Sequence, residues 1–541
     1  MGSTTKARSR EWPRRVGPTP LAAMLGYLLA FTALTWPLAG APLDAVVSHW
    51  DADIEHSLWV QWWFAQALAS PDHELFRSAM IAHPQAVDLQ LADLNLAVNA
   101  LSYPATPLLG LAGAYNALLL GAFLVSGLLT FRLAKRLGSE PPAAWVAGLV
   151  FAASPYWLAC LLNGWGYLVH TGVFPLVALA LFRVREDPGG RWLFALALAL
   201  AFAFHVTPYY FLYLLVLLPI LVLADAGAWR EVLRASRPVV WIFASATLVL
   251  AVAPRAVSML EASRASLVVH HGPQNTVLSA AISELVRPSF EAVAARAPEI
   301  GFLAVFLGYT LLATVLAGFL VTRRRVAYRP WLFGAGAMLL LALGPHPKWS
   351  SGLSFDAIPL PALWLQQLPA FEMTTNHWRW VLPASFCLCV LLARATTDLM
   401  ALAREFRRER WVPALVLAAY AAEVVLVFPI PLHKPLWDAR PSPIAALLRD
   451  RTDIRAVLDR SGRPKLNQTV HGKAIALGWL PRMPVETRRA QARLVAECRG
   501  LEVPCLRRFD IDAVILDDTR AVVLRGSPAA PELERLEVRS D

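Results

Sequence analysis

The feature that most limits the fold is a series of long apolar runs separated by short basic clusters. A helix needs roughly 20 apolar residues to span the hydrocarbon core of a bilayer. Eleven runs qualify, near residues 20–40, 114–132, 142–160, 168–184, 192–207, 208–225, 238–254, 301–322, 330–344, 380–397 and 412–430. Lys and Arg cluster before the first run and after every second run, as they do in cytoplasmic loops. The pattern predicts an all-α polytopic membrane protein with about 11 transmembrane helices and a cytoplasmic N-terminus.

Composition agrees with this class and excludes others. The 541 residues are 57% hydrophobic and only 16% charged, against about 25% charged in an ordinary globular domain. A disordered chain and a soluble enzyme with one large core are therefore excluded. The net charge of +11 lies in the topology clusters, so it does not indicate nucleic acid. Five cysteines without a CxxC pair exclude a disulfide scaffold and a zinc ribbon.

The chain divides into three parts. Residues 1–19 form a basic cytoplasmic N-terminus, 20–430 a transmembrane domain, and 431–541 a charged tail. Short strand-like runs in the tail predict a small α/β domain: 474–477, 512–516 and 521–524. An odd number of spans places this domain outside the cytoplasm. An oxidising compartment there permits a disulfide between Cys498 and Cys505.

The first external loop, 41–113, carries eight acids and one basic residue, Arg77. Asp51, Asp53 and Glu55 alternate in it, and three tryptophans follow: Trp59, Trp62 and Trp63. Because aromatic belts mark membrane surfaces, the segment predicts a carboxylate cluster at the outer water–lipid boundary. Asp53 could instead cap a helix over 54–69, with the tryptophans as anchors only.

Several ordered motifs accompany this segment. Asp53 precedes Trp59 by six residues, then come His83-Pro84 and Asp93. Further motifs follow in order: AYN (114–116), RLAKRLG (132–138), FAASPYWLA (151–159), PYYFLY (208–213), LGP (343–345), PLPALWLQQLPAF (359–371), HGK (471–473) and GWLPRMP (478–484). In this order the chain resembles bacterial membrane proteins of the GT-C glycosyltransferase superfamily. His83, where the group has an aromatic residue, and Trp165, where it tends to have His, depart from the pattern.

The resemblance implies a GT-C-like fold and a glycosyltransferase of the bacterial inner membrane. Such an enzyme transfers a sugar from a polyprenyl-phosphate-linked donor to a cell-envelope glycan, lipid or protein at the periplasmic face. The resemblance gives Asp53 the role of activating the acceptor hydroxyl, with Asp51 and Glu55 as alternates. Clustered acids can hold Mg²⁺ or Mn²⁺, but nothing in the sequence fixes a metal.

The leaving phosphate needs a cation, and Arg379 in the segment 376–380 fits that need. Its alternative interpretation is an arginine that snorkels to the membrane surface. Residues expected to help bind the donor are His377, His83, Asp93 and Glu299. The competing hypothesis is a non-enzymatic protein that binds or translocates lipid-linked glycans. Few ionisable residues lie within the spans, which favours chemistry at the surface over transport.

Overall fold

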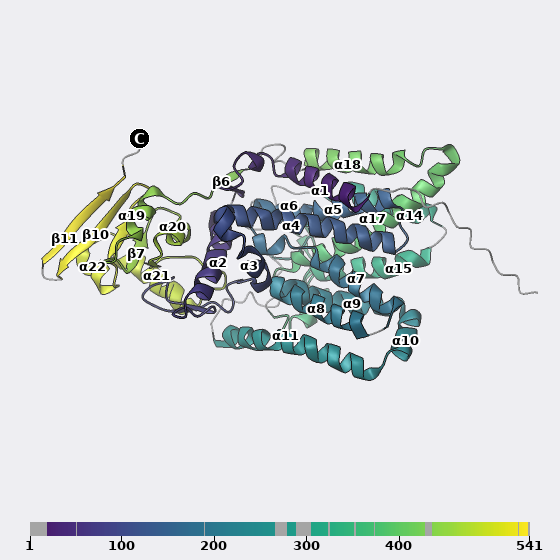
Figure 1. Ribbon diagram of the computed structural model, residues 1–541. Coiled ribbons are helices and arrows are strands. Elements are labelled where there is room, and N and C mark those ends of the chain that lie inside the picture. The colour runs from purple at the N-terminus through teal and green to yellow at the C-terminus, as the bar shows by residue number, and fades with distance from the viewer. Residues whose placement is uncertain are drawn as a thin grey trace, which may run out of the picture.

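The computed structural model describes residues 19–49, 51–188, 190–265, 278–287, 305–322, 325–350, 353–372, 374–427, 435–527 and 530–538. Most of the chain is a bundle of helices that lie side by side, with the last 110 residues at one end (Figure 1). The bundle helices are α1 (Pro20–Leu34), α4 (Thr106–Arg136), α5 (Pro141–Ala152), α6 (Pro155–Leu162), α7 (Val173–Glu186), α8 (Gly190–Val206), α9 (Pro208–Leu223), α10 (Ala226–Ala235), α11 (Pro238–Ala265), α14 (Tyr309–Val321), α15 (Arg329–Ala342), α17 (Val381–Ala403) and α18 (Trp411–Val427).

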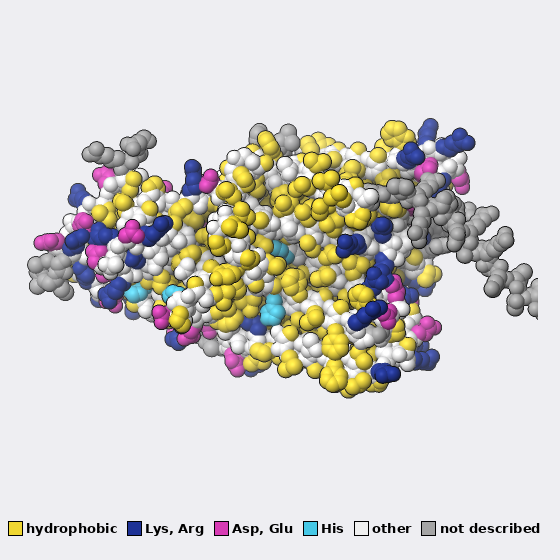
Figure 2. Space-filling model, in the orientation of Figure 1, with side chains coloured by type: hydrophobic (Ala, Val, Ile, Leu, Met, Phe, Trp, Pro, Cys, Tyr) yellow, Lys and Arg dark blue, Asp and Glu magenta, His cyan; other side chains and the backbone are white. Residues whose placement is uncertain are grey.

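Within the described ranges, five helical segments are long and apolar enough to cross a membrane: Thr106–Arg136, Pro141–Leu162, Gly166–Glu186, Pro238–Arg264 and His377–Phe406. The pair Pro208–Leu223 and Ala226–Ala235, bent by 97°, passes the same test together. Shorter apolar helices account for most of the remaining predicted runs, so the bundle is confirmed while the count of eleven spans stays a prediction. The flank of the bundle is largely hydrophobic, and Lys and Arg gather at the end opposite the C-terminal domain (Figure 2).

Close helix packing depends on small residues, as expected where lipid removes the hydrophobic drive between helices. A Cβ atom on Gly318 of α14 would lie 2.4 Å from the Cα atom of Ala395 on α17. Large aromatic side chains fill the wider gaps, and Phe386 of α17 contacts the rings of Phe151, Phe174 and Trp331. The buried hydrophobic residues of the bundle therefore form one continuous core.

The first external loop folds into β1 (Ala45–Val47), α2 (Asp51–Ala69), β2 (Arg77–Ser78), β3 (Val87–Asp88) and α3 (Leu96–Ser102). The stretch 91–110, which we expect to lie on or dip into the membrane face, contains α3 and the start of α4. Helix α4 is broken at Gly110, whose φ of 69° is not helical. A second external segment, between α15 and α17, holds β4 (Lys348–Ser350), β5 (Leu353–Ser354), α16 (Pro361–Leu365) and the 3-10 turn η4 (His377–Trp380), and α12 (Ile282–Val286) lies between α11 and α14.

The C-terminal part is a small α/β domain, as predicted from its strand-like runs. Its sheet has the order β11-β10-β9-β7-β8, in which β7 is parallel to both β8 and β9. The strands are β7 (Ala456–Asp459), β8 (Ala474–Ile475), β9 (Ala513–Ile515), β10 (Arg520–Ser527) and β11 (Ala530–Glu537), and the helices are α19 (Pro443–Arg449), α20 (Pro464–His471), α21 (Val485–Glu497) and α22 (Val503–Arg508). A disulfide joins Cys498 to Cys505, with Cα atoms 5.6 Å apart, as predicted.

Several contacts join this domain to the first external loop, and three of them lie at β1, at Met80 and His83, and at Trp59. Strand β6 (Leu436–Asp438) pairs with β1, and Ile475 exchanges backbone hydrogen bonds with Met80 and His83. At the third place the indole of Trp59 donates to Oε1 of Gln468, at 2.7 Å. Loop and domain therefore pack together at the end of the bundle, and α2 and α3 of the loop lie between the bundle and the C-terminal domain (Figure 1).

The three tryptophans of α2 do not form the predicted interfacial belt. Their exposed fractions are 0%, 8% and 1% for Trp59, Trp62 and Trp63. They share a core with residues of both the loop and the C-terminal domain, among them Ile81, Ile475, Leu480 and Met483. The prediction was wrong because a sequence shows that a surface is aromatic, but not which distant segment covers it.

Candidate functional site

Asp53 lies within α2, which begins at Asp51, so Asp53 does not cap a helix over 54–69. Its Oδ2 accepts a hydrogen bond of 3.0 Å from the indole of Trp165. Trp165, a departure from the resemblance, thus supplies a donor that orients the carboxylate. Gly164 allows this approach, because its φ is +70° and a Cβ there would lie 2.9 Å from the backbone nitrogen of Ile54.

Glu55 points away from this contact and toward the C-terminal domain. It is 6% exposed, and its Oε1 accepts from the backbone N–H groups of Lys465 (2.8 Å) and Leu466 (3.1 Å). These are first-turn residues of α20, so Glu55 satisfies donors that have no intrahelical partner. Burial raises the pKa of Glu55, while the charge of Lys465 and the two N–H donors act in the opposite direction.

Lys465 is fully buried beside α2. Its Nζ donates to the carbonyl of Trp479 at 3.0 Å and lies 5.5 Å from the centroid of the same ring. Burial lowers the pKa of Lys465 to about 8, partly offset by the charges of Glu55 and Asp53. The C-terminal domain thus brings a positive charge within electrostatic range of Asp53.

Arg379 is buried at the start of α17, with 6% of its surface exposed, so it does not snorkel. Its Nη2 donates to the hydroxyl of Tyr167 at 3.3 Å, and its guanidinium carbon lies 5.0 Å from the ring centroid of Tyr209. Among the described side chains, no carboxylate lies within salt-bridge distance of it, and its Nε has no hydrogen-bond partner. A buried guanidinium without a paired anion is the chemistry of an anion-binding site.

A second arginine reaches the same place from the C-terminal domain. The guanidinium carbon of Arg482 lies 5.4 Å from the ring centroid of Tyr209, and its Nη1 lies 3.5 Å from Oδ1 of Asp93. Asp93 is held at a φ of 52°, an uncommon conformation for a residue other than glycine. Sequence analysis expected Asp93 here but assigned no role to Arg482. Arg482 lies in the motif 478–484, which was the only indication in the sequence that this segment matters, and the motif does not indicate a contact with Asp93.

Asp93 and Arg482 are the charged residues among those that line an apolar groove of about 130 Å³. Side chains from three helices and one loop form its walls, including Phe204 of α8, Leu212 of α9, Met259 of α11 and Pro369. The groove therefore combines a hydrocarbon-like wall with two charged side chains, which suits an amphipathic ligand.

The other predicted residues lie elsewhere or outside the description. His377 is buried with no partner for its Nδ1, next to Gly344 and within electrostatic range of Lys348. His83 faces the C-terminal domain, where Asp510 and Asp512 are its charged neighbours, and burial lowers its pKa. Glu299 and the side chain of Asp51 lie outside the described residues. The structure therefore brings together Asp53, Asp93 and Arg379, and adds Tyr167, Tyr209 and Arg482.

The described carboxylates do not fit a metal site. No group of three or more His, Cys, Asp or Glu side chains converges within the described part of the chain. Asp93 pairs with Arg482, and Glu55 accepts from the backbone of α20. Because these oxygens are directed at cationic or N–H groups rather than at a common point, we derive no step through Mg²⁺ or Mn²⁺.

The fold is a bundle of apolar helices with a small domain at one end. Solved structures of the oligosaccharyltransferase AglB from the archaeon Archaeoglobus fulgidus, a GT-C superfamily member, share it. The complex with an inhibitory peptide and a dolichol-phosphate matches with a TM-score of 0.50 and 12% identity, over 92% of this chain and 69% of that one. The apo form gives 0.54 and 12% over the same shares, and the form tethered to an acceptor peptide containing the NVT sequon gives 0.52 and 12%, over 92% and 68%.

At this identity the likeness shows the fold alone. No protein-family model and no curated protein matches the sequence. The roles of individual residues must therefore be argued from their own geometry.

Proposed function

We propose that the protein is a glycosyltransferase that moves a sugar from a polyprenyl-phosphate-linked donor to the hydroxyl of a cell-envelope acceptor. One observation carries this proposal. Arg379 is buried without a described carboxylate at salt-bridge distance, and it lies beside a groove with an apolar wall. A lipid phosphate has both the anion and the hydrocarbon chain that this arrangement would accommodate. The fold neighbour AglB is described in complex with a dolichol-phosphate, which supports the same class of ligand.

In the proposed reaction, Asp53 accepts the proton of the acceptor hydroxyl as its oxygen attacks the anomeric carbon. The bond between that carbon and the phosphate oxygen breaks, and the lipid phosphate leaves with the electron pair. Arg379 and Arg482 stabilise the charge that develops on the phosphate. Trp165 keeps the base oriented by its hydrogen bond to Oδ2 of Asp53. Direct displacement of this kind inverts the anomeric centre.

The proposed location is the bacterial inner membrane, with the C-terminal domain on the periplasmic side. Basic side chains lie at the opposite end of the bundle, where cytoplasmic loops carry them (Figure 2). The disulfide between Cys498 and Cys505 is of the kind that persists in an oxidising compartment. A reporter that is active only in the cytoplasm, fused after Asp541, is expected to be silent, and its activity would contradict this orientation.

The function is tested in cells that lack the protein, by profiling their envelope glycans and lipid-linked sugars. Deletion is expected to remove one glycan modification and to raise the level of its lipid-linked donor. The wild-type chain should restore the glycan and Asp53→Asn should not, whereas Asp72→Asn, an exposed acid of the same loop, serves as the matched control. Restoration by Asp53→Asn at equal protein level would contradict catalysis by Asp53. If Asp53→Asn, Asp51→Asn and Glu55→Gln all restore the glycan, the result would favour a non-enzymatic carrier of lipid-linked glycans.

A further inference from the structure

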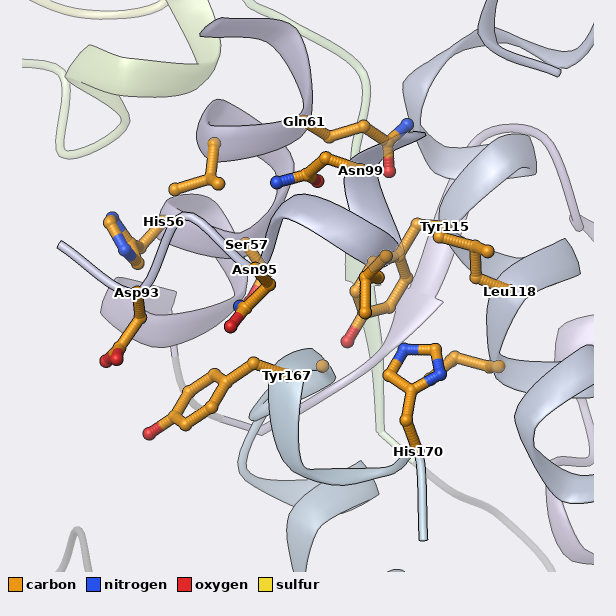
Figure 3. Close-up of a pocket in the computed structure, with 14 residues that line it drawn as sticks. His56, Ser57, Gln61, Asp93, Asn95, Asn99, Tyr115, Leu118, Tyr167 and His170 are labelled. Atoms are coloured by element: carbon orange, nitrogen blue, oxygen red, sulfur yellow. The ribbon is translucent and has the colours of Figure 1, made fainter. Parts of the chain in front are cut away.

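A recess next to Asp53 is distinct from the apolar groove in its chemistry. It has a volume of about 30 Å³ and lies among α2, α3, α4 and the 3-10 turn η2 (Gly166–Leu168). His56, Asn95, Tyr115, Tyr167 and His170 surround it, with Asp93 at its edge (Figure 3). Among the described residues, no lysine or arginine lines it. The recess thus offers neutral hydrogen-bonding groups and aromatic faces.

Some polar side chains of the recess only hold its walls. The amide of Asn99 donates to the carbonyl of Leu94 at 2.6 Å, and Ser57 Oγ donates to the carbonyl of Gly164 at 3.1 Å. These groups are satisfied within the protein, so they have little capacity left for a ligand.

Other polar groups remain available. His56 is 3% exposed, and its Nε2 contacts the carbonyl of Ala92 while its Nδ1 has no partner. Burial lowers the pKa of His56 well below its usual value, so the ring is neutral at physiological pH. Within the described residues, the side chains of Asn95, Tyr115 and His170 make no hydrogen bond, and Figure 3 shows them around one space. Asn95 has a φ of 29°, and such strained conformations concentrate at functional sites.

Tyr167 connects the recess to the proposed phosphate site. Its ring lines the recess, and its hydroxyl accepts a hydrogen bond from Arg379. Only the side chain of Tyr167 would therefore separate the recess from a group that is bonded to a phosphate at Arg379. Asp53 lies within electrostatic range of both Tyr115 and Tyr167, so that group would also be near the proposed base.

We infer that the recess binds the hydroxyl-bearing edge of an uncharged donor sugar. This inference rests on the proposed function and names its substrate class. Sugar hydroxyls need both donors and acceptors, which Asn95, Tyr115 and the two histidines provide. A uronic acid would meet no cation among the described lining residues. An amino sugar would gain little from Asp93, because this carboxylate is already paired with Arg482.

The size of the recess limits how much sugar enters. A volume of about 30 Å³ has room for roughly two or three water molecules. Such a space admits the hydroxyl groups along one edge of a single ring, while the rest of the ring stays toward Arg379. The recess therefore distinguishes sugars by the substituents on that edge.

The inference is tested with the full-length protein in detergent, without acceptor, by measuring its affinity for three kinds of ligand that share one polyprenyl chain. The first is the polyprenyl phosphate without a sugar, the second is a panel of neutral hexoses and pentoses linked to that phosphate, and the third is a hexuronic acid linked to it. At least one neutral sugar should bind about tenfold tighter than the bare carrier, and the hexuronic acid should not. Asn95→Gly, which fits the positive φ, and Tyr115→Phe should each reduce the gain about fivefold, as expected for one lost hydrogen bond. Neither should change the affinity for the bare carrier.

Tyr103→Phe, on an exposed tyrosine outside the recess, is the matched control and should bind like wild type. The inference is overturned if no neutral sugar binds tighter than the bare carrier, if the hexuronic acid binds as tightly, or if both variants keep the full gain. Failure of the proposed function has a different signature. In that case the bare carrier does not bind the wild-type protein, or Arg379→Lys leaves its affinity unchanged, and the inference falls with it.

Discussion

Arg379 and Arg482 lie against the same aromatic ring, with guanidinium carbons 5.0 and 5.4 Å from the centroid of Tyr209. They are separated by about a hundred residues of sequence, since Arg379 lies in the 3-10 turn η4 before α17 and Arg482 lies in the C-terminal domain. Two positive charges this close repel each other, and the nearby Asp93 contacts only Arg482 at salt-bridge distance among the described residues. A ligand with more than one negative charge, such as a phosphate, would relieve the repulsion.

Replacement of either arginine by lysine should weaken donor binding. We expect Arg379→Lys and Arg482→Lys each to lower the affinity for the lipid carrier about tenfold, because an ammonium cannot reproduce the planar fork of donors. The double variant should lose less than the product of the two losses, since the residues share one ligand and one ring. Binding of the carrier to purified protein measures this. Arg440→Lys, an exposed arginine of the same domain, is the control, and strictly additive losses would argue against a shared site.

Asp53→Asn should abolish turnover while the protein stays folded. The amide oxygen of Asn can still accept from Trp165, but the base is lost, which costs roughly 10²–10⁴ in rate. The measurement is sugar transfer at saturating donor, together with the thermal unfolding midpoint. An unchanged midpoint with lost turnover is the expected result. A parallel fall of both quantities would instead give Asp53 a structural role.

Glu55→Ala should loosen the C-terminal domain from the bundle. Two buried N–H groups of α20 would lose their acceptor, at a cost of about 1–3 kcal/mol. Glu55→Gln keeps an acceptor and should lose less. Limited proteolysis between bundle and domain reports the change, with Glu486→Ala, an exposed acid in the first turn of α21, as control. Equal protease resistance of Glu55→Ala and wild type would contradict the capping role.

Because of Lys465, the free energy of unfolding should change with pH in the alkaline range. Burial lowers its pKa to about 8 in the folded protein, from 10.5 for an ordinary lysine. Between these values the unfolded chain holds a proton that the folded chain has released, so this group makes the free energy of unfolding rise with pH. Below pH 8 the destabilisation is present in full, at about 3 kcal/mol. Unfolding midpoints from pH 7 to 10.5 should show that slope in wild type and a flatter one in Lys465→Met. Identical slopes would mean that Lys465 does not titrate in this range.

Removal of the disulfide should destabilise the C-terminal domain only modestly. Cys498 and Cys505 are 7 residues apart, and closing so short a loop contributes about 2–3 kcal/mol in the loop-entropy model. We expect Cys498→Ser with Cys505→Ser to lower the free energy of unfolding by that amount without loss of membrane insertion. Mass spectrometry of protein from native membranes checks the bond itself, and two free thiols there would refute it.

The sequence predicts the features of the fold that depend on neighbouring residues, such as apolar helices and short strands. Apolar runs and basic clusters identify the bundle, because each helix must satisfy its own backbone in lipid. Short alternating runs likewise identify the strands of the C-terminal domain, and β8, β9 and β10 lie where those runs occur. The unbalanced acids of the first external loop predict a site of chemistry there, and this stays a prediction.

What could not be predicted depends on contacts across hundreds of residues. In the sequence Glu55 resembles one member of a carboxylate cluster, but in the structure it accepts hydrogen bonds from the first turn of α20. Arg482 resembles any surface arginine, and only the fold places it beside Asp93 and Tyr209. Trp165 was considered a missing polar residue, although its indole N–H is the group that contacts Asp53. Spacing along a helix or strand carries no information about such partners.

The docking of the last domain onto the first loop has a consequence for the order in which the protein is made. Asp53 and Asp93 leave the ribosome with the first helices, whereas Gln468 and Arg482 are synthesised about 400 residues later. Since Gln468 binds Trp59 and Arg482 binds Asp93, the site stays unassembled while most of the chain is already inserted. A nascent or truncated chain can therefore occupy the membrane correctly and still be unable to hold its substrate.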